Sequence, residues 1–537
     1  MNKNILLYCL LCISVLSQAQ STITLETRYS SGTGSWVSRQ AKLVNLIANF
    51  STITNAALLD VNNYGSSNKT SATATGFFYT KKINNRWWII DPEGKAGFNI
   101  AVNAIPTISD NTDLGKVYDR LWELGFNGAG SFMSDEGQSI RYNSTHTNQF
   151  SYTRRVNFYN TYVGSRKSYY PTTSTRLTGS MLDYIFVFDP KFAEFCDARA
   201  KTFGDAYKTE KNLLGYFLDN EIGFHTDQLQ KLLRDLDPGD PSYEMAKTFA
   251  ISKGLTVTQV VNNYSSVSTA IRNEFATKLA DKYYEITTKA MKKYDPNHIT
   301  LGSRLHGGAR DLEGVVKAAA TWCDVVSVNF YDLYSPNEQI TSSTKYKAWI
   351  DKPIIIGEFY TKGYDAYEQG IVTGFSGAGW VVKTQTHRGY FYQNTCIEFI
   401  QSGTVVGWHY FKYSDDTDSN KGMYKQTSMG GDEYTEMTNQ MRLVNINRFN
   451  LVDFFTAIGQ TKIQNISFHI SENNLILDGE IEPAEISIFD LNAKLLLSGL
   501  LDNMFKTINI STLNKGVYVL KLQTKDGKKF YTTKFIR

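Results

Sequence analysis

The amino-acid sequence predicts an α/β protein: a (β/α)8 TIM barrel with long loops and an N-terminal extension, followed by a small C-terminal β-sandwich. Three observations predict this architecture. The chain has 537 residues, enough for about three domains of roughly 100–200 residues each. Apolar runs of strand length alternate with helical stretches between residues 86 and 461, as in a parallel sheet. From residue 462 onward, short alternating runs follow one another at roughly ten-residue spacing, which is typical of a sandwich.

Strands buried on both faces are apolar throughout, and this property identifies the strands of the predicted barrel. Seven such runs lie at 98–102, 126–131, 213–218, 299–303, 325–330, 353–357 and 405–411, and an eighth strand is predicted near 184–189. Helices are predicted at 113–124, 190–209, 267–294, 312–320 and 389–401. An open doubly wound sheet is the alternative, but no Gly-x-Gly-x-x-Gly motif or phosphate-binding loop supports a nucleotide-binding version of it.

The beginning of the chain is typical of a secretory signal peptide. Residues 1–20 contain Lys3, an apolar run at 5–16 and the small residues Ser17 and Ala19 before the expected cleavage site. The apolar run is shorter than the roughly 20 residues that cross a bilayer, so no transmembrane segment is predicted. The predicted domains are then the signal peptide, an N-terminal extension or β layer at 21–85, a barrel domain at 86–461 and a tail at 462–537.

The tail carries a recognisable pattern at its end. A strand that begins Gly516-Val517-Tyr518 is followed by basic residues up to the terminal Arg537, and this resembles the C-terminal sorting domain of the type IX secretion system of Bacteroidetes. The resemblance implies that the type IX machinery is a partner and that the chain is released or held at the outer-membrane surface. An ordinary carbohydrate-binding or fibronectin-like module is the alternative.

Composition excludes several classes of protein. Lys plus Arg number 56 and Asp plus Glu 52, and a net charge of +4 on so long a chain is too small to indicate nucleic-acid binding.

Three cysteines lie beyond the signal, Cys196, Cys323 and Cys396, and their wide spacing predicts buried thiols and no zinc site. The run 415–420 lacks the glycine and glutamate of a calcium loop and is interpreted as a solvated rim. We therefore predict no metal and no cofactor. Aromatic residues make up 13% of the chain, and their rings either fill a core or stack on sugars.

Two glutamates follow apolar strands at the end of the predicted barrel where active sites lie. Glu221 comes after the strand at 213–218, and Glu358 comes after the strand at 353–357. Because all the strands end at one mouth, the two carboxylates are expected to face each other. Retaining glycoside hydrolysis uses such a pair, one as general acid/base and one as nucleophile, about 5–5.5 Å apart. A single glutamate after a strand is commonly a solvated loop residue, so the matched pair is the informative feature.

These motifs resemble clan A glycoside hydrolases, which carry Asn-Glu after the fourth strand and Glu after the seventh. The resemblance implies that Glu221 is the acid/base, that Glu358 is the nucleophile, and that Asn220 binds the 2-hydroxyl of the sugar. Many clan members also have an arginine after the second strand, which the run at 126–131 lacks, so the partner of Glu358 is left open. Arg304 is interpreted either as a ligand for sulfate groups or as half of a structural ion pair.

The same resemblance implies substrate-binding roles at other strand ends. His306 follows the fifth strand and would lie beside the acid/base, and Tyr331 follows the sixth and would hydrogen-bond to the nucleophile. Trp408, with His409, lies in the last strand and would supply an aromatic platform for the sugar at the cleaved position.

Within the clan, the segments 86–94, 98–103, 216–221 and 407–415 resemble agarase-like enzymes, including family 50. The resemblance implies a secreted, retaining β-glycoside hydrolase that cleaves a galactan-type polysaccharide such as agarose, porphyran or carrageenan. Two alternatives stay open. One is another clan A activity, such as a β-galactosidase, mannanase or glucanase. The other is a non-catalytic surface protein that binds polysaccharide, although such a protein has no need of two strand-end carboxylates.

Overall fold

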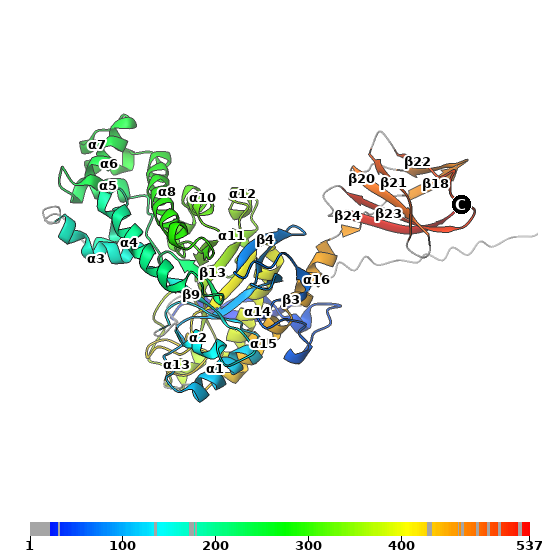
Figure 1. Ribbon diagram of the computed structural model, residues 1–537, viewed down its shortest axis with the longest axis horizontal. Helices are drawn as coiled ribbons and strands as arrows, with labels where there is room; N and C mark the ends of the chain where they lie inside the picture. The colour runs from blue at the N-terminus through cyan, green and yellow to red at the C-terminus, as the bar shows by residue number, and fades with distance from the viewer. Residues whose placement is uncertain are drawn as a thin grey trace, which may run out of the picture. The chain divides into compact units, whose positions relative to one another are not determined.

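The computed structural model (Figure 1) divides into two compact units, one up to Arg448 and one from Phe449 to Arg537. It describes residues 22–29, 33–133, 137–170, 177, 180–426, 432–459, 461–462, 467–478, 483–490, 494–502, 506–524 and 529–537. The signal peptide predicted at residues 1–20 lies outside the described residues. Within these ranges, no helix has the length and apolarity needed to cross a membrane.

In the described residues, eight parallel strands form one sheet at the centre of the first unit. In their order across the sheet they are β11 (Ile299–Thr300), β10 (Leu213–Phe217), β9 (Ser151–Arg155), β8 (Gly128–Ala129), β7 (Asn99–Val102), β16 (Val405–Tyr410), β13 (Ile354–Phe359) and β12 (Val326–Asn329). The chain after β11 also bonds to β12, because Leu305 N donates to Ser327 O at 2.9 Å and Asn329 N donates to Leu305 O at 2.9 Å. A parallel sheet whose two edges approach each other in this way is consistent with a (β/α)8 barrel.

Helices surround this sheet, and the five predicted helices are all present. The helices of the first unit are α1 (Asn111–Glu123), α2 (Gly137–Asn143), α3 (Phe158–Tyr169), α4 (Pro190–Tyr207), α5 (Gln228–Asp235), α6 (Pro241–Ser252), α7 (Val257–Asn262), α8 (Thr269–Tyr294), α9 (Gly307–Arg310), α10 (Glu313–Trp322), α11 (Asn337–Ile340), α12 (Tyr346–Trp349), α13 (Tyr364–Glu368), α14 (Gln385–Ser402) and α15 (Thr435–Ile446).

The ends of these helices are set by ordinary capping residues. Asp110 accepts hydrogen bonds from the first backbone N–H groups of α1, and Ser268 does the same for α8. Pro190 begins α4, where its missing N–H costs nothing, and Gly403 ends α14 in the left-handed region at φ 71°. Helices α5, α6 and α7 pack together beside α8 in the long connection after β10 (Figure 1).

One predicted strand is wrong. The run at 184–189 is not a strand; it follows a short 3-10 turn, and its apolar side chains are buried in a loop that leads into α4. Gln228 Oε1 accepts the backbone N–H of Ile185, which satisfies that buried loop. The third strand is β9 instead. Its sequence is polar, but Ser151, Tyr152 and Thr153 are buried, and Ser151 Oγ is hydrogen-bonded to Asn99.

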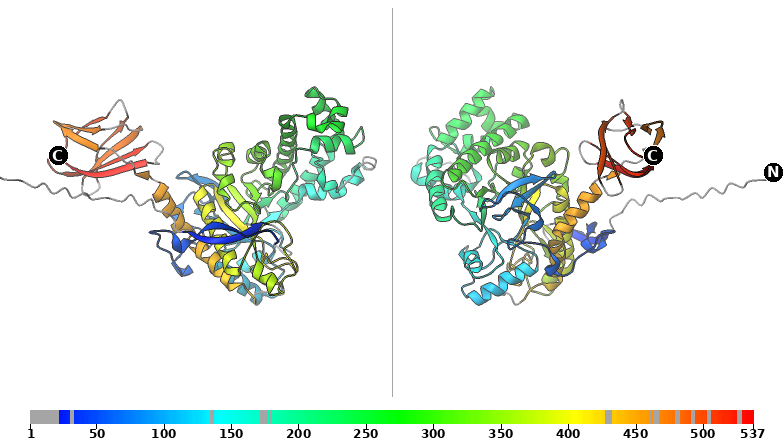
Figure 2. Two further views of the ribbon diagram at one scale, coloured as in Figure 1. Left: turned by 180° about the vertical axis from the view of Figure 1, so that it is seen from behind. Right: turned by 45° about the vertical axis from the view of Figure 1, so that its right-hand side comes forward.

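The N-terminal residues contribute to two small sheets of the first unit, one mixed and one antiparallel. Strands β1 (Thr22–Tyr29) and β2 (Val37–Lys42) pair as a hairpin. On its other side β1 pairs with β15 (Trp380–Val382), which in turn pairs with β14 (Thr361–Gly363). The left view of Figure 2 shows this hairpin in dark blue. A second sheet has the order β3 (Ser67–Ser71), β6 (Lys95–Gly97), β5 (Arg86–Ile90) and β4 (Tyr79–Ile83). The boundary predicted at 85/86 falls inside the β4–β5 hairpin.

The second unit begins in α16 (Arg448–Gly459) and continues as strands. Among its described residues, a first sheet contains β17 (Thr461–Lys462), β24 (Lys529–Ile536), β23 (Val517–Thr524), β20 (Ala484–Phe489) and β21 (Leu495–Leu501), and a second contains β18 (Ser467–Ser471), β19 (Asn474–Asp478) and β22 (Thr507–Asn509). Both sheets contribute to the same apolar core, since Leu475 and Leu477 cluster with Ile486, Ile488 and Leu520.

The core of the first unit contains the three predicted thiols. Cys196, Cys323 and Cys396 are free and buried, as the sequence predicted. Burial raises the pKa of the Cys396 thiol well above its usual value, so this thiol stays protonated and behaves as a small apolar group.

A tight contact inside the sheet provides a test of this packing. A Cβ at Gly215 of β10 would lie 2.2 Å from the carbonyl oxygen of Ile299 in β11. We expect Gly215→Ala to lower the free energy of unfolding by at least about 1–3 kcal/mol, the usual cost of overpacking. Gly164 in α3 has no atom within 4 Å of its Cβ position, so Gly164→Ala is the matched control and should be neutral or slightly stabilising. Equal melting temperatures for the two variants, measured by calorimetry, would contradict this packing.

Candidate active site

Glu221 lies just beyond β10 in a conformation that non-glycine residues rarely adopt. Its φ is 54°, and its backbone N–H donates to Ser303 O at 2.9 Å. The side-chain Oε1 accepts a hydrogen bond of 2.7 Å from Asn329 Nδ2, and His306 Nδ1 lies 3.7 Å from the same oxygen. The side chain is 31% exposed, so this carboxyl group is held by the Asn329 amide and remains open to solvent.

Glu358 has the opposite surroundings. It lies near the end of β13 and is 5% exposed. Its Oε1 is 2.6 Å from Arg304 Nη2 in a buried ion pair, and its Oε2 accepts a hydrogen bond from the hydroxyl of Tyr331. Glu358 thus receives one charge-assisted hydrogen bond and one hydrogen bond from a phenol. Glu358 is therefore bound by a cation and a phenol, whereas Glu221 accepts its hydrogen bond from a neutral amide.

Arg304 follows β11 and connects several strand ends. It is fully buried, with a φ of 54°, and its Nη1 donates to Ser131 Oγ at 2.9 Å beyond β8. Its Nη2 also donates to Gly357 O at 3.0 Å in β13. The ion-pair interpretation of Arg304 is thus correct, and the partner of Glu358 comes from the fifth strand. The signal was present in the sequence, because Arg304 follows an apolar strand just as the two glutamates do.

Tyr331 brings the two glutamates into one electrostatic environment. Burial raises its pKa well above the usual value of 10.0, and the charges of Glu358 and Glu221 raise it further. The phenol consequently stays protonated and donates to Glu358. Its ring centroid lies 5.5 Å from that of His306 and 4.9 Å from that of Tyr360. The structure therefore brings together four of the predicted site residues: Glu221, His306, Tyr331 and Glu358.

Asn220 and Asn329 complete the surroundings of Glu221. Asn220 is half-buried, and within the described residues its Oδ1 is buried and has no hydrogen-bond partner, which suits a group that binds a hydroxyl. Asn329 ends β12 and is the register partner of Glu358 in β13. Asn329 was not predicted as a site residue, because an asparagine at a strand end gives no signal until its neighbour is known.

Trp408 does not lie where its predicted role requires. Its ring is fully buried and packs against Phe98 and Phe399, with centroid distances of 5.4 and 6.1 Å, and its Nε1 donates to Tyr392 at 2.9 Å. Successive strand residues point to opposite sides of a sheet, and Trp408 points toward α14. The burial contradicts the platform role, because no face of the ring is open to a sugar.

His409 points to the other side of β16 but is also fully buried. Its Nε2 is 2.6 Å from Asn99 Oδ1, and its ring lies 5.9 Å from that of Phe217. Burial lowers the pKa of His409 well below 6.5, and the charge of Arg304 lowers it further. His409 is therefore a neutral residue in the interior of the sheet, and contact with substrate is contradicted by its burial.

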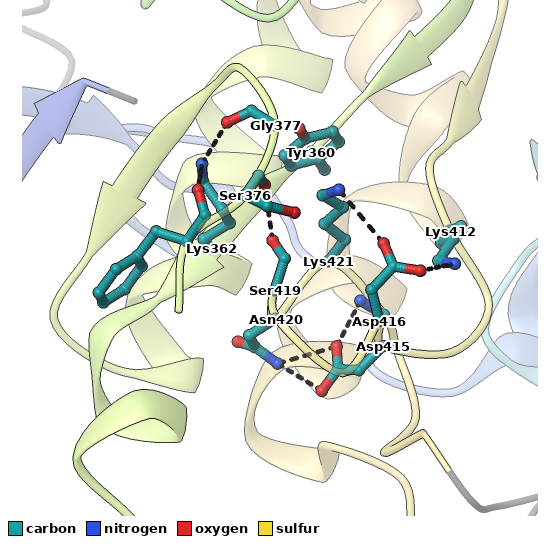
Figure 3. A network of polar contacts seen from close by, with 12 residues as sticks. Tyr360, Lys362, Ser376, Gly377, Lys412, Asp415, Asp416, Ser419, Asn420 and Lys421 are labelled. Atoms are coloured by element: carbon teal, nitrogen blue, oxygen red, sulfur yellow. Dashed lines mark hydrogen bonds and ion pairs between the residues drawn. The ribbon is translucent and has the colours of Figure 1, made fainter. Parts of the chain in front are cut away.

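A polar network joins the loops around Tyr360 (Figure 3). The hydroxyl of Tyr360 donates to Ala378 O at 2.6 Å, and Lys362 Nζ donates to Phe375 O at 2.9 Å and Gly377 O at 2.8 Å. Burial lowers the pKa of Lys362 to about 8, and the charge of Lys421 adds to this effect. The network keeps the ring of Tyr360 against Tyr331.

The same network includes the run at 415–420, which is not the predicted solvated rim. Asp415 and Asn420 are 4% and 1% exposed, and Asn420 Nδ2 donates to both carboxylate oxygens of Asp415 at 2.9 and 3.0 Å. Asp416 forms ion pairs with Lys412 and with Lys421, the second at 3.2 Å (Figure 3). The run is therefore a hydrogen-bonded turn that joins the loops after β13 and β16.

Two strand-end carboxyl groups in contrasting surroundings, on a parallel sheet surrounded by helices, are the arrangement that glycoside hydrolases of the barrel type use. Comparisons with known proteins agree. Beta-agarase B of Vibrio sp. (strain JT0107) is 27% identical over 259 residues, which cover 42% of this chain and 26% of the relative. Beta-agarase A of the same strain is 32% identical over 147 residues, which cover 26% and 14% respectively. The match thus spans about a quarter or less of these curated relatives.

Solved structures match over more of the chain. The crystal structure of BpGH50 is 28% identical with a TM-score of 0.71, and the match covers 81% of this chain and 96% of that one. The structure of an exo-beta-agarase has the same fold at 20% identity, with a TM-score of 0.57 and coverage of 74% and 68%. Residues 461–536 match the family described as the secretion system C-terminal sorting domain.

These findings confirm the resemblance predicted from the motifs. The first unit is similar to beta-agarases and to the structure of BpGH50, and the second carries a type IX sorting domain. The sorting domain indicates export, with the protein secreted or held at the cell surface.

The buried ion pair predicts a stability change. Arg304→Met leaves Glu358 buried without its cation, and breaking a buried pair in this way costs about 3–5 kcal/mol. The control is Lys317→Met, because the pair between Lys317 and Glu313 is exposed and worth at most about 1 kcal/mol. Urea unfolding monitored by tryptophan fluorescence measures both changes. A loss below about 1 kcal/mol for Arg304→Met would show that Glu358 is not held as described.

Another prediction concerns Asp219, which directly precedes Asn220 and Glu221 in the sequence and is fully buried. Burial raises its pKa from 3.8 to about 6, although it accepts hydrogen bonds from Tyr159 N, Asn160 N and Tyr283 Oη. A raised pKa means that the folded state binds this proton more tightly than the unfolded chain does. The resulting stabilisation is complete below about pH 4 and is lost as the pH rises through 6, and two pKa units correspond to about 3 kcal/mol.

Unfolding of the wild type and of Asp219→Asn between pH 4 and pH 7 tests this. The free-energy difference between the two proteins should shift in favour of the variant by about 2 kcal/mol over this range as the pH rises. A difference that does not change with pH would contradict the raised pKa.

Proposed function

We propose that the chain is an exported retaining β-glycoside hydrolase that cleaves a galactan-type polysaccharide such as agarose, porphyran or carrageenan. Glu358 is the nucleophile and Glu221 the general acid/base. The observation that carries this proposal is the contrast between the two carboxyl groups. Glu358 is buried and bound by the cation of Arg304 and the phenol of Tyr331, whereas Glu221 is partly exposed and held by the neutral Asn329.

A retaining mechanism requires carboxyl groups about 5–5.5 Å apart. The register of the sheet supports a short separation, because Asn329 binds Glu221 and is itself the strand partner of Glu358. The charges of both glutamates act on the phenol of Tyr331, which supports the same conclusion.

In the first step, a carboxylate oxygen of Glu358 attacks the anomeric carbon as the glycosidic bond breaks. Protonated Glu221 gives its proton to the leaving oxygen. Arg304 and Tyr331 keep Glu358 in position for attack. As the covalent bond forms, the negative charge of Glu358 decreases and the ion pair with Arg304 weakens.

In the second step, Glu221 is a carboxylate and takes a proton from water, whose oxygen attacks the anomeric carbon and releases Glu358. His306 lies near Glu221 and at the edge of Tyr331, where it can bind a sugar hydroxyl. Asn220 offers its unpaired amide oxygen to the 2-hydroxyl of the sugar.

The architecture and the route of export complete the proposal. The eight-stranded sheet is a closed barrel, the two sheets of the tail form a sandwich, and the type IX machinery recognises that tail after a signal peptide at 1–20 directs the chain across the inner membrane. The segments 21–85, 86–461 and 462–537 are then the N-terminal layer, the catalytic domain and the sorting domain. Product profiles on agarose, porphyran and carrageenan, resolved by size, identify the galactan.

Two substrates separate the roles of the glutamates. An aryl β-galactoside with a good leaving group needs no acid, whereas a galactan does. We expect Glu221→Gln to reduce kcat/KM on galactan by about 10²–10⁴-fold and to change the first step on the aryl glycoside far less. Glu358→Gln should reduce both by about 10⁴-fold or more.

The matched control is Glu313→Gln, since Glu313 is exposed on α10, where it pairs with Lys317. It should retain full activity on both substrates. Near-normal turnover of galactan by either Glu221→Gln or Glu358→Gln would overturn the assignment. Binding of galactan without release of reducing sugar by the wild type would indicate a binding protein.

A further inference from the structure

Arg155 is a cation at the mouth of the sheet that the mechanism does not use. It is the last residue of β9 and lies level with Phe217 of β10. The preceding residue, Arg154, points outward, since its guanidinium lies 4.5 Å from the ring centroid of Tyr207 in α4. Because successive strand residues face opposite sides, Arg155 points inward, toward the active site.

The surroundings of Arg155 agree with this direction. Its guanidinium lies over the ring of Phe132, 4.0 Å from the centroid. Burial lowers the pKa of Arg155, the charge of Arg304 lowers it further, and the charges of Glu358 and Asp219 act in the opposite sense. Arg155 is therefore close enough to Arg304 and Glu358 to interact electrostatically with both.

The two arginines near Phe132 differ in their partners. Arg304 is paired with Glu358 and bonded to Ser131 and Gly357. Among the described residues, Arg155 makes no hydrogen bond and no ion pair, and its Nε is buried without a partner. A half-buried guanidinium normally has a partner for its donors, so one that lacks it at the mouth of an active site indicates a ligand.

The charge balance indicates the sign of that ligand. When Glu221 carries its catalytic proton, the charge of Glu358 is matched by that of Arg304. The other carboxyl group that acts on Arg155 is Asp219, which accepts its hydrogen bonds from Tyr159, Asn160 and Tyr283, so Arg155 has no carboxylate bonded to it among the described residues. A neutral sugar cannot compensate the charge of Arg155, whereas an oxyanion on the sugar can form a bidentate, charge-assisted pair with it.

We propose that Arg155 recognises an anionic substituent of the galactan, a sulfate ester or a carboxylate, and makes the enzyme selective for charged over neutral chains. This inference rests on the proposed function and names its substrate class. Phe132 covers one face of the guanidinium, so the N–H donors in its plane remain free at the edge for two oxygens of the substituent.

Kinetics on matched substrates test the inference. The substrates are a sulfated galactan oligosaccharide, the same oligosaccharide after chemical desulfation, and a galactan oligosaccharide that carries a carboxylate. We expect the wild type to prefer an anionic substrate, and Arg155→Gln to lower its kcat/KM on that substrate by at least about tenfold, chiefly through KM. The change on the desulfated oligosaccharide should be less than about twofold, and Arg155→Lys should recover some of the loss. The anionic oligosaccharide on which Arg155→Gln lowers kcat/KM identifies the substituent as sulfate or carboxylate.

Arg154→Gln is the matched control, because the neighbouring side chain points outward, and it should not alter the ratio between charged and neutral substrates. An equal loss on both substrates in Arg155→Gln would assign Arg155 to positioning of Glu358 and overturn the inference. So would an unchanged ratio, or a wild type that prefers the desulfated chain.

A binding measurement keeps this test separate from the proposed function. Calorimetry with Glu221→Gln and with Glu221→Gln/Arg155→Gln measures affinity for the three oligosaccharides without turnover. If the wild type releases no reducing sugar, the catalytic proposal fails, yet selective loss of anionic binding in the double variant still supports the role of Arg155. Equal affinities of the two proteins for every oligosaccharide would overturn it.

Discussion

The ion pair between Arg304 and Glu358 is the interaction on which the rest of the site depends. Both groups are buried, and removing two charges from water costs several kcal/mol per ion unless geometry and further hydrogen bonds compensate. Compensation here comes from Ser131, Gly357 and Tyr331, which belong to or follow three different strands. The same contacts that stabilise the pair therefore fix the ends of the strands relative to one another and orient the nucleophile.

The acid/base depends on this arrangement indirectly. Asn329 holds Glu221 and is paired in register with Glu358, so the position of one carboxyl group is transmitted to the other through a single strand end. Glu221 and Arg304 both adopt a positive φ of 54°, a conformation that costs free energy in non-glycine residues. Strain at these two positions is retained because it directs both side chains into the mouth of the sheet.

Much of this site follows from a simple rule, that chemistry lies after the apolar strands. The rule located Glu221, Glu358, His306 and Tyr331. It missed β9, because Ser151 and Thr153 are polar and become buried only through partners on other strands. It also misplaced Trp408 and His409, because pattern alone does not say how deep a side chain lies or which partners bury it. Arg304 was visible, but its choice between substrate and Glu358 depends on a distance that no spacing encodes.

Covalent trapping tests the central claim most directly. A 2-deoxy-2-fluoro galactosyl fluoride, or an oligosaccharide that bears this group, forms the glycosyl-enzyme quickly and releases it slowly, and mass spectrometry of the digested protein locates the bond. The arrangement around Arg304 predicts one label per chain, on the peptide that contains Glu358, and its removal by galactan acceptors. A label on Glu221, or inactivation of an enzyme that carries no label on Glu358, would contradict the account.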